Sequence, residues 1–187
     1  MKQPEQNLQD QEKQQSSIAW FKLAELVNRG EKEKALTFYR LLSHSFDDKA
    51  YVSQLEGDLL WFFQDRQALE KYQHAAILYQ EEKKLLSAVF VYEHLLTLEP
   101  ENSDYLIKAI NYYTELDWPE KFNAKFVDLI NLFEQQKISS ELIFDLIQNI
   151  LDFVQEDKNR QKWVLKELKK ITKIIPENLS EKILSSL

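Results

Sequence analysis

The segment from residue 72 to residue 102 constrains the fold of this chain more than any other stretch. It reads YQHAAILYQEEKKLLSAVFVYEHLLTLEPEN, in which small and aromatic residues recur at regular intervals. Ala76 and Ala88 would let two antiparallel helices approach closely, while the aromatic side chains fill the space beside them. Pro100 would end the second helix, because proline lacks the amide hydrogen that a helix interior needs. The segment is therefore predicted to form two antiparallel helices joined by a turn.

Seven residues of this segment have the type and spacing of the tetratricopeptide pattern, in which bulky, small and aromatic residues precede a proline. They are Tyr72, Ala75, Ala76, Tyr79, Ala88, Tyr92 and Pro100. The segment thus resembles a tetratricopeptide repeat, and an ordinary helical hairpin with the same stripes is the alternative. The resemblance implies an all-α fold, a right-handed α-solenoid of antiparallel helix pairs with about nine or ten helices.

The composition also favours an all-helical chain. The 187 residues include only 2 glycines and 4 prolines, so turns that need a positive φ must be scarce, and a β-rich fold with many tight hairpins is disfavoured. Hydrophobic residues make up 44% of the chain, which allows a sizeable core. Because the chain has no cysteine, disulfide and thiolate chemistry are excluded.

The chain is expected to contain a short arm and one domain. Residues 1–16 are rich in glutamine and poor in large apolar side chains, so we expect a disordered arm. Residues 17–187 are expected to form a single tetratricopeptide-like solenoid. Within it, residues 17–135 resemble the repeats, and residues 136–187 are expected to form divergent C-terminal helices that end in a capping helix.

A second periodicity runs through the N-terminal half, where Ala24 is expected to face the core. A period of 33 residues relates Ala24 to Gly57, Ala35 to Ala68, and Tyr39 to Tyr72. This period makes the helix that contains Tyr72 the second of its pair, whereas the segment 72–102 makes it the first. Two repeat registers therefore meet at Tyr72, and the sequence leaves open which helices line a concave face.

Three expectations concern the helices after residue 116. Asp117 is expected to cap a helix with Pro119 in its first turn, because aspartate caps well and proline is tolerated there. Phe122 stands where the repeat pattern has alanine, so this helix pair is expected to be splayed wider than the preceding ones. The next helix, to about Gln155, is apolar on several sides and is expected to be buried between its neighbours.

The last long helix is predicted over residues 158–175 and carries an apolar stripe and a basic stripe. The basic stripe precedes the apolar one by two residues, about 200° on a helix, so it lies opposite the core face. These basic-face candidates are Lys162, Lys166, Lys169 and Lys173. We interpret them as the solvated outer face of a capping region, which solenoids need. Attachment to an acidic partner, nucleic acid or an anionic membrane is the alternative.

Charge is distributed unevenly along the chain. The formal net charge is −7, and residues 157–187 contain eight Lys or Arg and four Asp or Glu. This C-terminal part therefore carries +4, and residues 1–156 carry −11. The acidic balance speaks against a general nucleic-acid binder, and no apolar run is long enough to span a bilayer. We therefore expect neither nucleic acid nor a membrane as a partner.

Motifs for catalysis and cofactor binding are not found in the sequence. The two glycines are too far apart for a phosphate-binding loop. The three histidines, His44, His74 and His94, share no metal-ligand spacing. Four acidic residues could mimic a carboxylate metal site, but the Glu-x-x-His element of helical di-metal proteins is missing; they are Glu141, Asp145, Asp152 and Asp157. We therefore expect no enzyme activity, no cofactor and no metal.

Together these features predict a non-catalytic scaffold or adaptor that binds a peptide or a partner protein in a helical-repeat groove. The resemblance implies that first helices line this groove. If the helix containing Tyr72 is a first helix, the polar groove candidates are Gln73, Gln80, Asp104, Asn111 and Thr114.

Two alternative functions stay open. In size, acidity and repeat number the chain is similar to small chaperones of bacterial secretion systems, a narrower version of the adaptor. A helical-bundle enzyme or metal-binding regulatory subunit, working through the acidic residues near Asp145, belongs to a different class. Because the first residues lack the apolar run of a secretory signal, we expect a cytoplasmic protein.

Overall fold

The computed structural model describes residues 18–173 and 177–184, apart from the side chains of residues 178, 179 and 182. The described residues form helices and turns without any β-strand, so the all-α prediction is confirmed. The right-handed solenoid winding stays a prediction. The arm expected over residues 1–16 lies outside the described residues.

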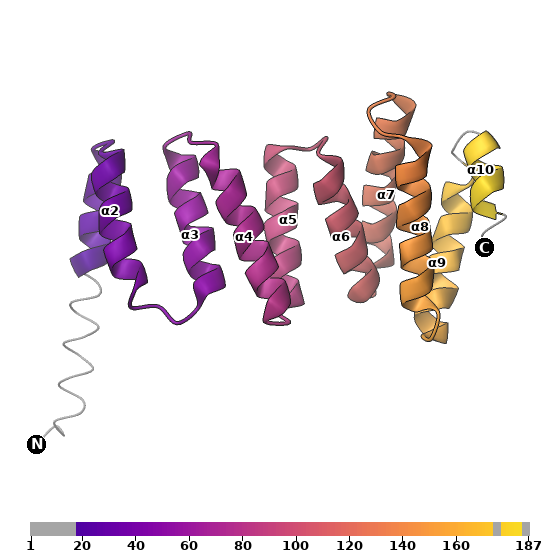
Figure 1. Cartoon of the computed structure of the whole chain (residues 1–187), viewed down its shortest axis with the longest axis horizontal. Coiled ribbons are helices and arrows are strands. Elements are labelled where there is room, and N and C mark those ends of the chain that lie inside the picture. The colour runs from indigo at the N-terminus through magenta and orange to yellow at the C-terminus, as the bar shows by residue number, and fades with distance from the viewer. Residues whose placement is uncertain (1–17, 174–176, 185–187) are drawn as a thin grey trace, which may run out of the picture. The chain divides into compact units, whose positions relative to one another are not determined.

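Short turns and loops connect the helices from the first one to α9 (Figure 1). The first helix covers residues 18–28. The others are α2 (Lys32–Ser43), α3 (Lys49–Phe62), α4 (Gln67–Glu81), α5 (Leu85–Leu98), α6 (Ser103–Glu115), α7 (Pro119–Glu134), α8 (Ser140–Val154), α9 (Lys158–Ile171) and α10 (Glu177–Leu184).

Local capping signals explain where several of these helices begin. Four N-cap side chains accept hydrogen bonds from backbone amides of the first turn, which satisfies donors that have no partner within the helix. They are Asp48, Asn102, Ser139 and Asp157. Gly30 ends the first helix with a φ of 71°, a left-handed conformation that glycine adopts without a steric penalty.

The chain divides into two compact units, residues 1–78 (unit 1) and residues 79–187 (unit 2). The border falls inside α4, the helix in which the two repeat registers of the sequence meet. The expectation of one continuous solenoid over residues 17–187 stays a prediction.

In unit 1, α3 and α4 pack through a glycine and a tyrosine ring. A Cβ atom built on Gly57 would lie only 2.8 Å from two carbons of the Tyr72 ring. The Tyr72 hydroxyl donates a hydrogen bond to Asp58 Oδ1 at 2.8 Å. Close approach of α3 and α4 at this point therefore requires a residue without a side chain.

The burial expected for Ala24 is wrong, although the sequence period relates it to Gly57. Ala24 is exposed, whereas Leu23 and Leu26 each keep only 7% of their surface accessible. These two leucines lie three residues apart on one face of the helix. Their burial removes more apolar area from water than burial of alanine would.

In unit 2, α6 and α7 pack along each other more extensively than any other pair of described helices. The wide splay expected from Phe122 is therefore wrong. Phe122 is fully buried, but its ring meets Trp163 of α9 edge to face at 5.5 Å and Phe126 at 5.5 Å. The bulky side chain fills the space between α7 and α9, so it does not separate α7 from α6.

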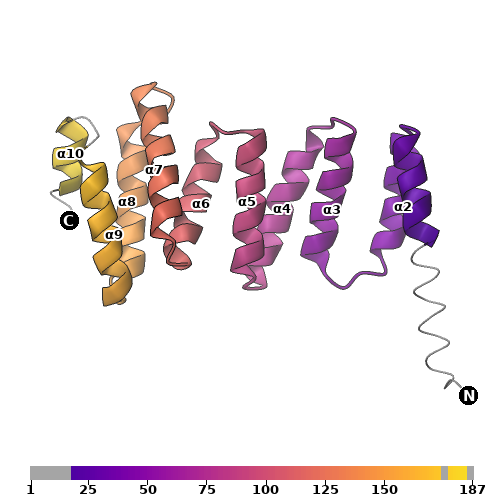
Figure 2. The same ribbon diagram turned by 180° about the vertical axis from the view of Figure 1, so that it is seen from behind.

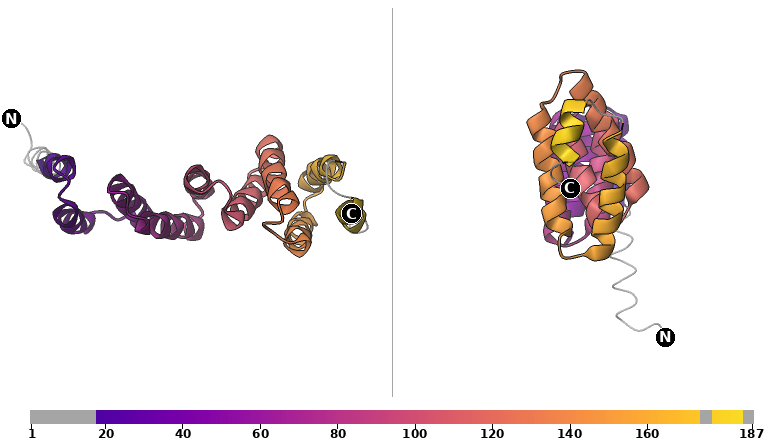
Figure 3. Two further views of the ribbon diagram at one scale, coloured as in Figure 1. Left: turned by 90° about the horizontal axis from the view of Figure 1, so that it is seen from above. Right: turned by 90° about the vertical axis from the view of Figure 1, so that its right-hand side faces the viewer.

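The C-terminal helices differ from expectation in two respects. The helix expected to reach residue 175 ends at Ile171, and Thr172 is its C-cap. α8 buries a single face, because Phe153 keeps 50% of its surface exposed. Figure 3 (right) shows α8 and α9 as neighbours, with α10 against them. Ser180 Oγ of α10 donates to the Thr172 carbonyl at 2.9 Å.

Helices alternate between two sides of unit 2. In Figure 1, α8 lies in front of α7 and α9, and in Figure 2, seen from behind, α7 and α9 lie in front of α8. α7 and α9 therefore belong to one side of the unit. That side carries the surface described next.

Candidate binding surfaces

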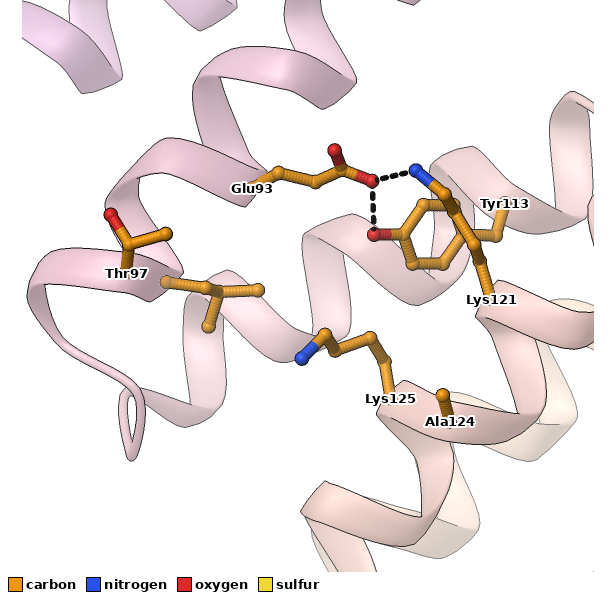
Figure 4. A pocket seen from close by; sticks show the side chains of 7 residues that line it. Glu93, Thr97, Tyr113, Lys121, Ala124 and Lys125 are labelled. Atoms are coloured by element: carbon orange, nitrogen blue, oxygen red, sulfur yellow. Dashed lines mark hydrogen bonds and ion pairs between the residues drawn. The ribbon is translucent and has the colours of Figure 1, made fainter.

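A hollow of about 290 Å³ lies between α5 and α7, with α6 at its base (Figure 4). We call it the α5–α7 hollow. It is lined by Glu93, Leu96, Thr97, Tyr113, Lys121, Ala124 and Lys125.

Helical spacing places these side chains together. Glu93 and Thr97 are four residues apart on α5, and Lys121 and Lys125 are four residues apart on α7, so each pair covers one turn of one face. Tyr113 reaches the hollow from α6. Three helices thus build one concave site.

A network of hydrogen bonds and an ion pair fixes the charged side chains at one end of the hollow. Glu93 accepts a hydrogen bond from the Tyr113 hydroxyl at 2.9 Å and forms an ion pair with Lys121. The Lys121 ammonium also lies 4.9 Å from the centre of the Trp118 ring, within cation–π range. Burial, and then the neighbouring Glu93 carboxylate, raise the pKa of Tyr113. The tyrosine therefore remains a protonated donor that keeps Glu93 in place.

The remaining lining groups are suited to recognition. Lys125 pairs with Asp128 at 2.8 Å, and the Thr97 hydroxyl donates to the His94 carbonyl at 2.7 Å. Leu96 and Ala124 contribute apolar surface. The hollow thus combines an apolar wall with a rim of hydroxyl, carboxylate and ammonium groups.

Two further hollows continue from this one on the same side of unit 2. A hollow of about 520 Å³ between α7 and α9 shares Ala124 with the α5–α7 hollow, and its other lining residues include Trp163, Lys166 and Lys170. A hollow of about 490 Å³ on α9 shares Lys166 and Lys170 with the second. The three hollows form one continuous surface, which we call the α5–α7–α9 face.

A buried carboxylate ties α7 to α9 beneath this face. Glu167 accepts hydrogen bonds from Asn123 Nδ2 at 2.7 Å and from Lys170 Nζ at 2.6 Å. Burial opposes ionisation of Glu167, but the hydrogen bonds from Lys170 and Asn123 outweigh it and lower its pKa. Glu167 is therefore a stable anion that orients Lys170 along the surface.

An ion pair fixes the start of α9 against the turn between α6 and α7. Arg160 donates to both carboxylate oxygens of Asp117, with N–O distances of 2.9 and 3.1 Å, and Trp163 Nε1 donates to Asp117 Oδ1 at 3.1 Å. The hydrogen bonds from Arg160 lower the pKa of Asp117. The helix cap expected at Asp117 is wrong: Trp118 is the N-cap, and Asp117 has a φ of 57° that turns its carboxylate toward α9.

The predicted groove candidates do not line the α5–α7 hollow. Asp104 and Asn111 are exposed on α6, but they lie nine and two residues before Tyr113, which is about 180–200° around the helix. Gln80 is exposed and accepts a hydrogen bond from the Tyr112 hydroxyl at 2.9 Å. Gln73 is half-buried in unit 1.

Thr114 is wrong as a groove candidate. Only 1% of its surface is accessible, and its hydroxyl donates to the Ile110 carbonyl of its own helix at 2.9 Å. A buried threonine satisfies its hydroxyl by bonding back to the preceding turn. It therefore offers no side chain to a partner.

The four basic-face candidates are exposed, and in the described part of the chain none has a carboxylate within ion-pair distance. Lys162, Lys166 and Lys169 lie on α9, whereas Lys173 lies in the turn after it. By contrast, eight of the eleven lysines between residues 18 and 157 have an ion-pair partner. The basic face is therefore an unusual surface for this chain.

The acidic residues considered as a metal site are not brought together. Asp157 caps α9 through bonds to backbone amides, and Asp145 and Asp152 are exposed along α8. Over residues 18–173 and 177–184 the structure contains no group of three or more His, Cys, Asp or Glu side chains arranged to hold a metal ion.

Unit 1 carries a different hollow, of about 430 Å³, between the first helix and α2. Its apolar part consists of Leu26, Phe38 and Leu41, and Leu41 keeps 66% of its surface exposed.

Sequence reasoning missed Glu93, Thr97, Lys121 and Lys125 as candidate site residues. The signal that could have found them is the 33-residue period, which makes α5 and α7 first helices of their pairs. The predicted groove candidates follow instead from the register that begins a first helix at Tyr72.

None of the described helices is both long enough and apolar enough to cross a lipid bilayer. No family model matches the chain, and a comparison with curated proteins found no significant similarity.

Proposed function

We propose that this protein is a non-catalytic interaction module and that unit 2 binds a segment of another protein on the α5–α7–α9 face. The observation that carries the proposal is the α5–α7 hollow, in which an apolar wall is surrounded by polar groups from three helices. An apolar centre with a polar rim is the usual anatomy of a protein interface.

The size of the hollow supports a side chain of a partner as its occupant. A volume of about 290 Å³ is at the lower limit for pockets that enclose a whole small molecule, which start at roughly 300 Å³. The hollow is open, so the backbone of the bound segment can continue beyond it along α7.

Exposed apolar residues next to the hollow support the same proposal. Leu86 and Phe90 keep 51% and 54% of their surfaces exposed. They precede Glu93 by seven and three residues and so lie on the same face of α5. A partner segment anchored in the hollow can cover these side chains and remove their surface from water.

The resemblance to tetratricopeptide repeats supports a protein or peptide as the ligand, since such solenoids bind peptides and partner domains in their grooves. The buried small and aromatic residues of segment 72–102 are consistent with it.

The test compares two tryptophan substitutions that differ only in the side of unit 2 they block. Ala124→Trp fills the α5–α7 hollow from an exposed position on α7, and Asn111→Trp places the same bulk on the exposed side of α6. Tagged wild type and both variants would be used to isolate partners from the organism's own extract, and the bound stoichiometry measured.

We expect wild type and Asn111→Trp to retain a stoichiometric partner and Ala124→Trp to lose it. Loss with Asn111→Trp alone would instead assign binding to the α6 side, where Asp104 and Asn111 lie. If neither substitution affects the partner, the proposed site is wrong.

A further inference from the structure

We propose that the segment bound on the α5–α7–α9 face is an extended one with an apolar end and an acidic end. Its apolar end contacts α5 and the α5–α7 hollow, and its carboxylates pair with the lysines of α9. This inference rests on the proposed function and adds the chemistry of the partner.

The charge of the face carries the proposal. Seven lysines and three glutamates line the three hollows, although the chain as a whole has a net charge of −7. Two of the glutamates already have partners, Glu93 with Lys121 and Glu167 with Lys170. The uncompensated charge is therefore positive, and it is concentrated at the α9 end.

The apolar side chains are concentrated at the opposite end of the same face. Leu86 and Phe90 are exposed on α5, while the α9 hollow has Leu165 as its only apolar lining residue among those described. A ligand that matches both ends must itself be apolar at one end and acidic at the other.

The spacing of the lysines suits a polypeptide. Successive basic residues rise by three or four positions along α9, which corresponds to roughly 4.5–6 Å on a helix. The acidic end of the segment follows the axis of α9, at an angle to the part that crosses from α5. Alternate residues of an extended chain are about 6.6 Å apart, so carboxylates at every second position of this end can meet successive lysines.

Shape and charge favour an acidic polypeptide over the two other anionic partners, which are a lipid bilayer and a nucleic acid. A flat bilayer surface leaves the connected hollows empty, whereas the side chains of an extended segment can fill them. The −11 charge of residues 1–156 repels a nucleic acid more strongly than a short peptide, because a nucleic acid carries a charge on every nucleotide. Its bases would also find no row of exposed aromatic rings on α9.

The experiment uses fluorescein-labelled synthetic peptides and the full chain. Each peptide has a Leu/Phe-containing half and a half with glutamate at alternate positions, and the two halves are made in both orders. Matched peptides carry glutamine or lysine in place of glutamate. Binding is measured by fluorescence anisotropy at low salt and at physiological ionic strength.

We expect the glutamate peptide to bind about tenfold more tightly than the glutamine peptide, because several exposed ion pairs, each weak by itself, act together. The preference should shrink at physiological salt. It should also be lost in the triple variant Lys162→Glu, Lys166→Glu, Lys169→Glu. The single variant Lys166→Glu should reduce the preference. Lys108→Glu on α6 is its matched control, since both lysines are exposed and lie on helices of unit 2. Lys108→Glu should leave the preference intact.

Several results would overturn the inference: equal binding of the glutamate and glutamine peptides, equal effects of Lys166→Glu and Lys108→Glu, or no peptide binding at all. Tighter binding of duplex DNA or of phosphatidylserine vesicles than of the glutamate peptide would also reject it. If Ala124→Trp abolishes binding of both peptides and wild type shows no preference for glutamate, the proposed function stands and only the acidic partner is rejected. If Ala124→Trp weakens neither peptide nor natural partner, the proposed function fails as well.

Discussion

Unit 1 and unit 2 hold successive helices together by different means. At the α3–α4 contact of unit 1, a glycine lies directly against the Tyr72 ring, and the tyrosine hydroxyl is bonded to Asp58. In unit 2, an aromatic cluster around Phe122 joins α7 to α9, and the Asp117–Arg160 ion pair fixes the end of the same contact. The first contact depends on close approach, and the second on bulk and charge.

The exposed surfaces of the two units also differ in their chemistry. Unit 1 exposes large apolar side chains, among them Phe21 with 77% and Leu41 with 66% of their surfaces accessible. Unit 2 presents a face that changes from apolar on α5 to basic on α9. The charged side chains that shape the contacts of unit 2, such as Glu167 and Lys170, also orient its surface groups. Packing and binding chemistry are therefore linked in unit 2.

The largest expected effect is on the aromatic cluster of unit 2. Phe122→Ala should lower the free energy of unfolding by about 3–5 kcal/mol, because it removes a fully buried ring and leaves a cavity beside Trp163. Urea denaturation would measure the loss, and amide hydrogen exchange would locate it in α6, α7 and α9.

Phe90→Ala is the matched control for this substitution. The Phe90 ring is 54% exposed, so its removal should change stability by less than about 0.5 kcal/mol. A similar loss for both variants would show that bulk in the α7–α9 contact is not what holds unit 2 together.

The glycine contact of unit 1 should give a smaller effect. Gly57→Ala forces a methyl group against the Tyr72 ring, and overpacking of this kind costs about 1–3 kcal/mol, offset by about 1 kcal/mol of improved helix propensity. We expect a net loss of up to about 2 kcal/mol in urea denaturation, with faster hydrogen exchange in α3 and α4.

Gly57→Ala combined with Tyr72→Leu provides the test of cause. Without the ring, alanine at position 57 should be less destabilising. The loss of unfolding free energy in the double variant should therefore be smaller than the sum of the losses in the two single variants. Strict additivity, or a gain in stability from Gly57→Ala alone, would contradict a close-approach contact between α3 and α4.

The smallest expected effect concerns the ion pair of unit 2. Asp117→Asn keeps a residue that tolerates the positive φ at this position but removes the charge, so stability should fall by about 1 kcal/mol at neutral pH. The folded-state pKa of Asp117 is lowered, so its contribution is present above the unfolded pKa and is lost as the pH falls through the folded value. The difference between wild type and Asp117→Asn should therefore close below about pH 4.

Thermal unfolding at several pH values, followed by circular dichroism, would measure this difference. A stability difference that stays constant between pH 7 and pH 3 would mean that the charge of Asp117 does not contribute.

Much of the local structure could be predicted from the sequence. The starts at Asp48, Asn102 and Ser139 follow from side chains that bond to amides two or three residues away. The stop at Gly30 follows from a conformation that glycine adopts freely. Six of the seven pattern residues of segment 72–102 are buried as expected, and the seventh, Pro100, ends the segment at the surface. Phe90, an aromatic residue outside the pattern, is exposed.

The sequence by itself therefore determined the helices and most of their core residues, because these depend on neighbours within one or two turns. Tertiary structure alone decided that Asp117 pairs with Arg160, 43 residues later, that Phe122 turns toward Trp163, and that Thr114 is buried. It also decided that α5, α7 and α9 share the face with the connected hollows. The physical reason is that each residue turns a helix by about 100°, so a small change in repeat register exchanges the buried and exposed faces, and only the packing of distant helices selects between them.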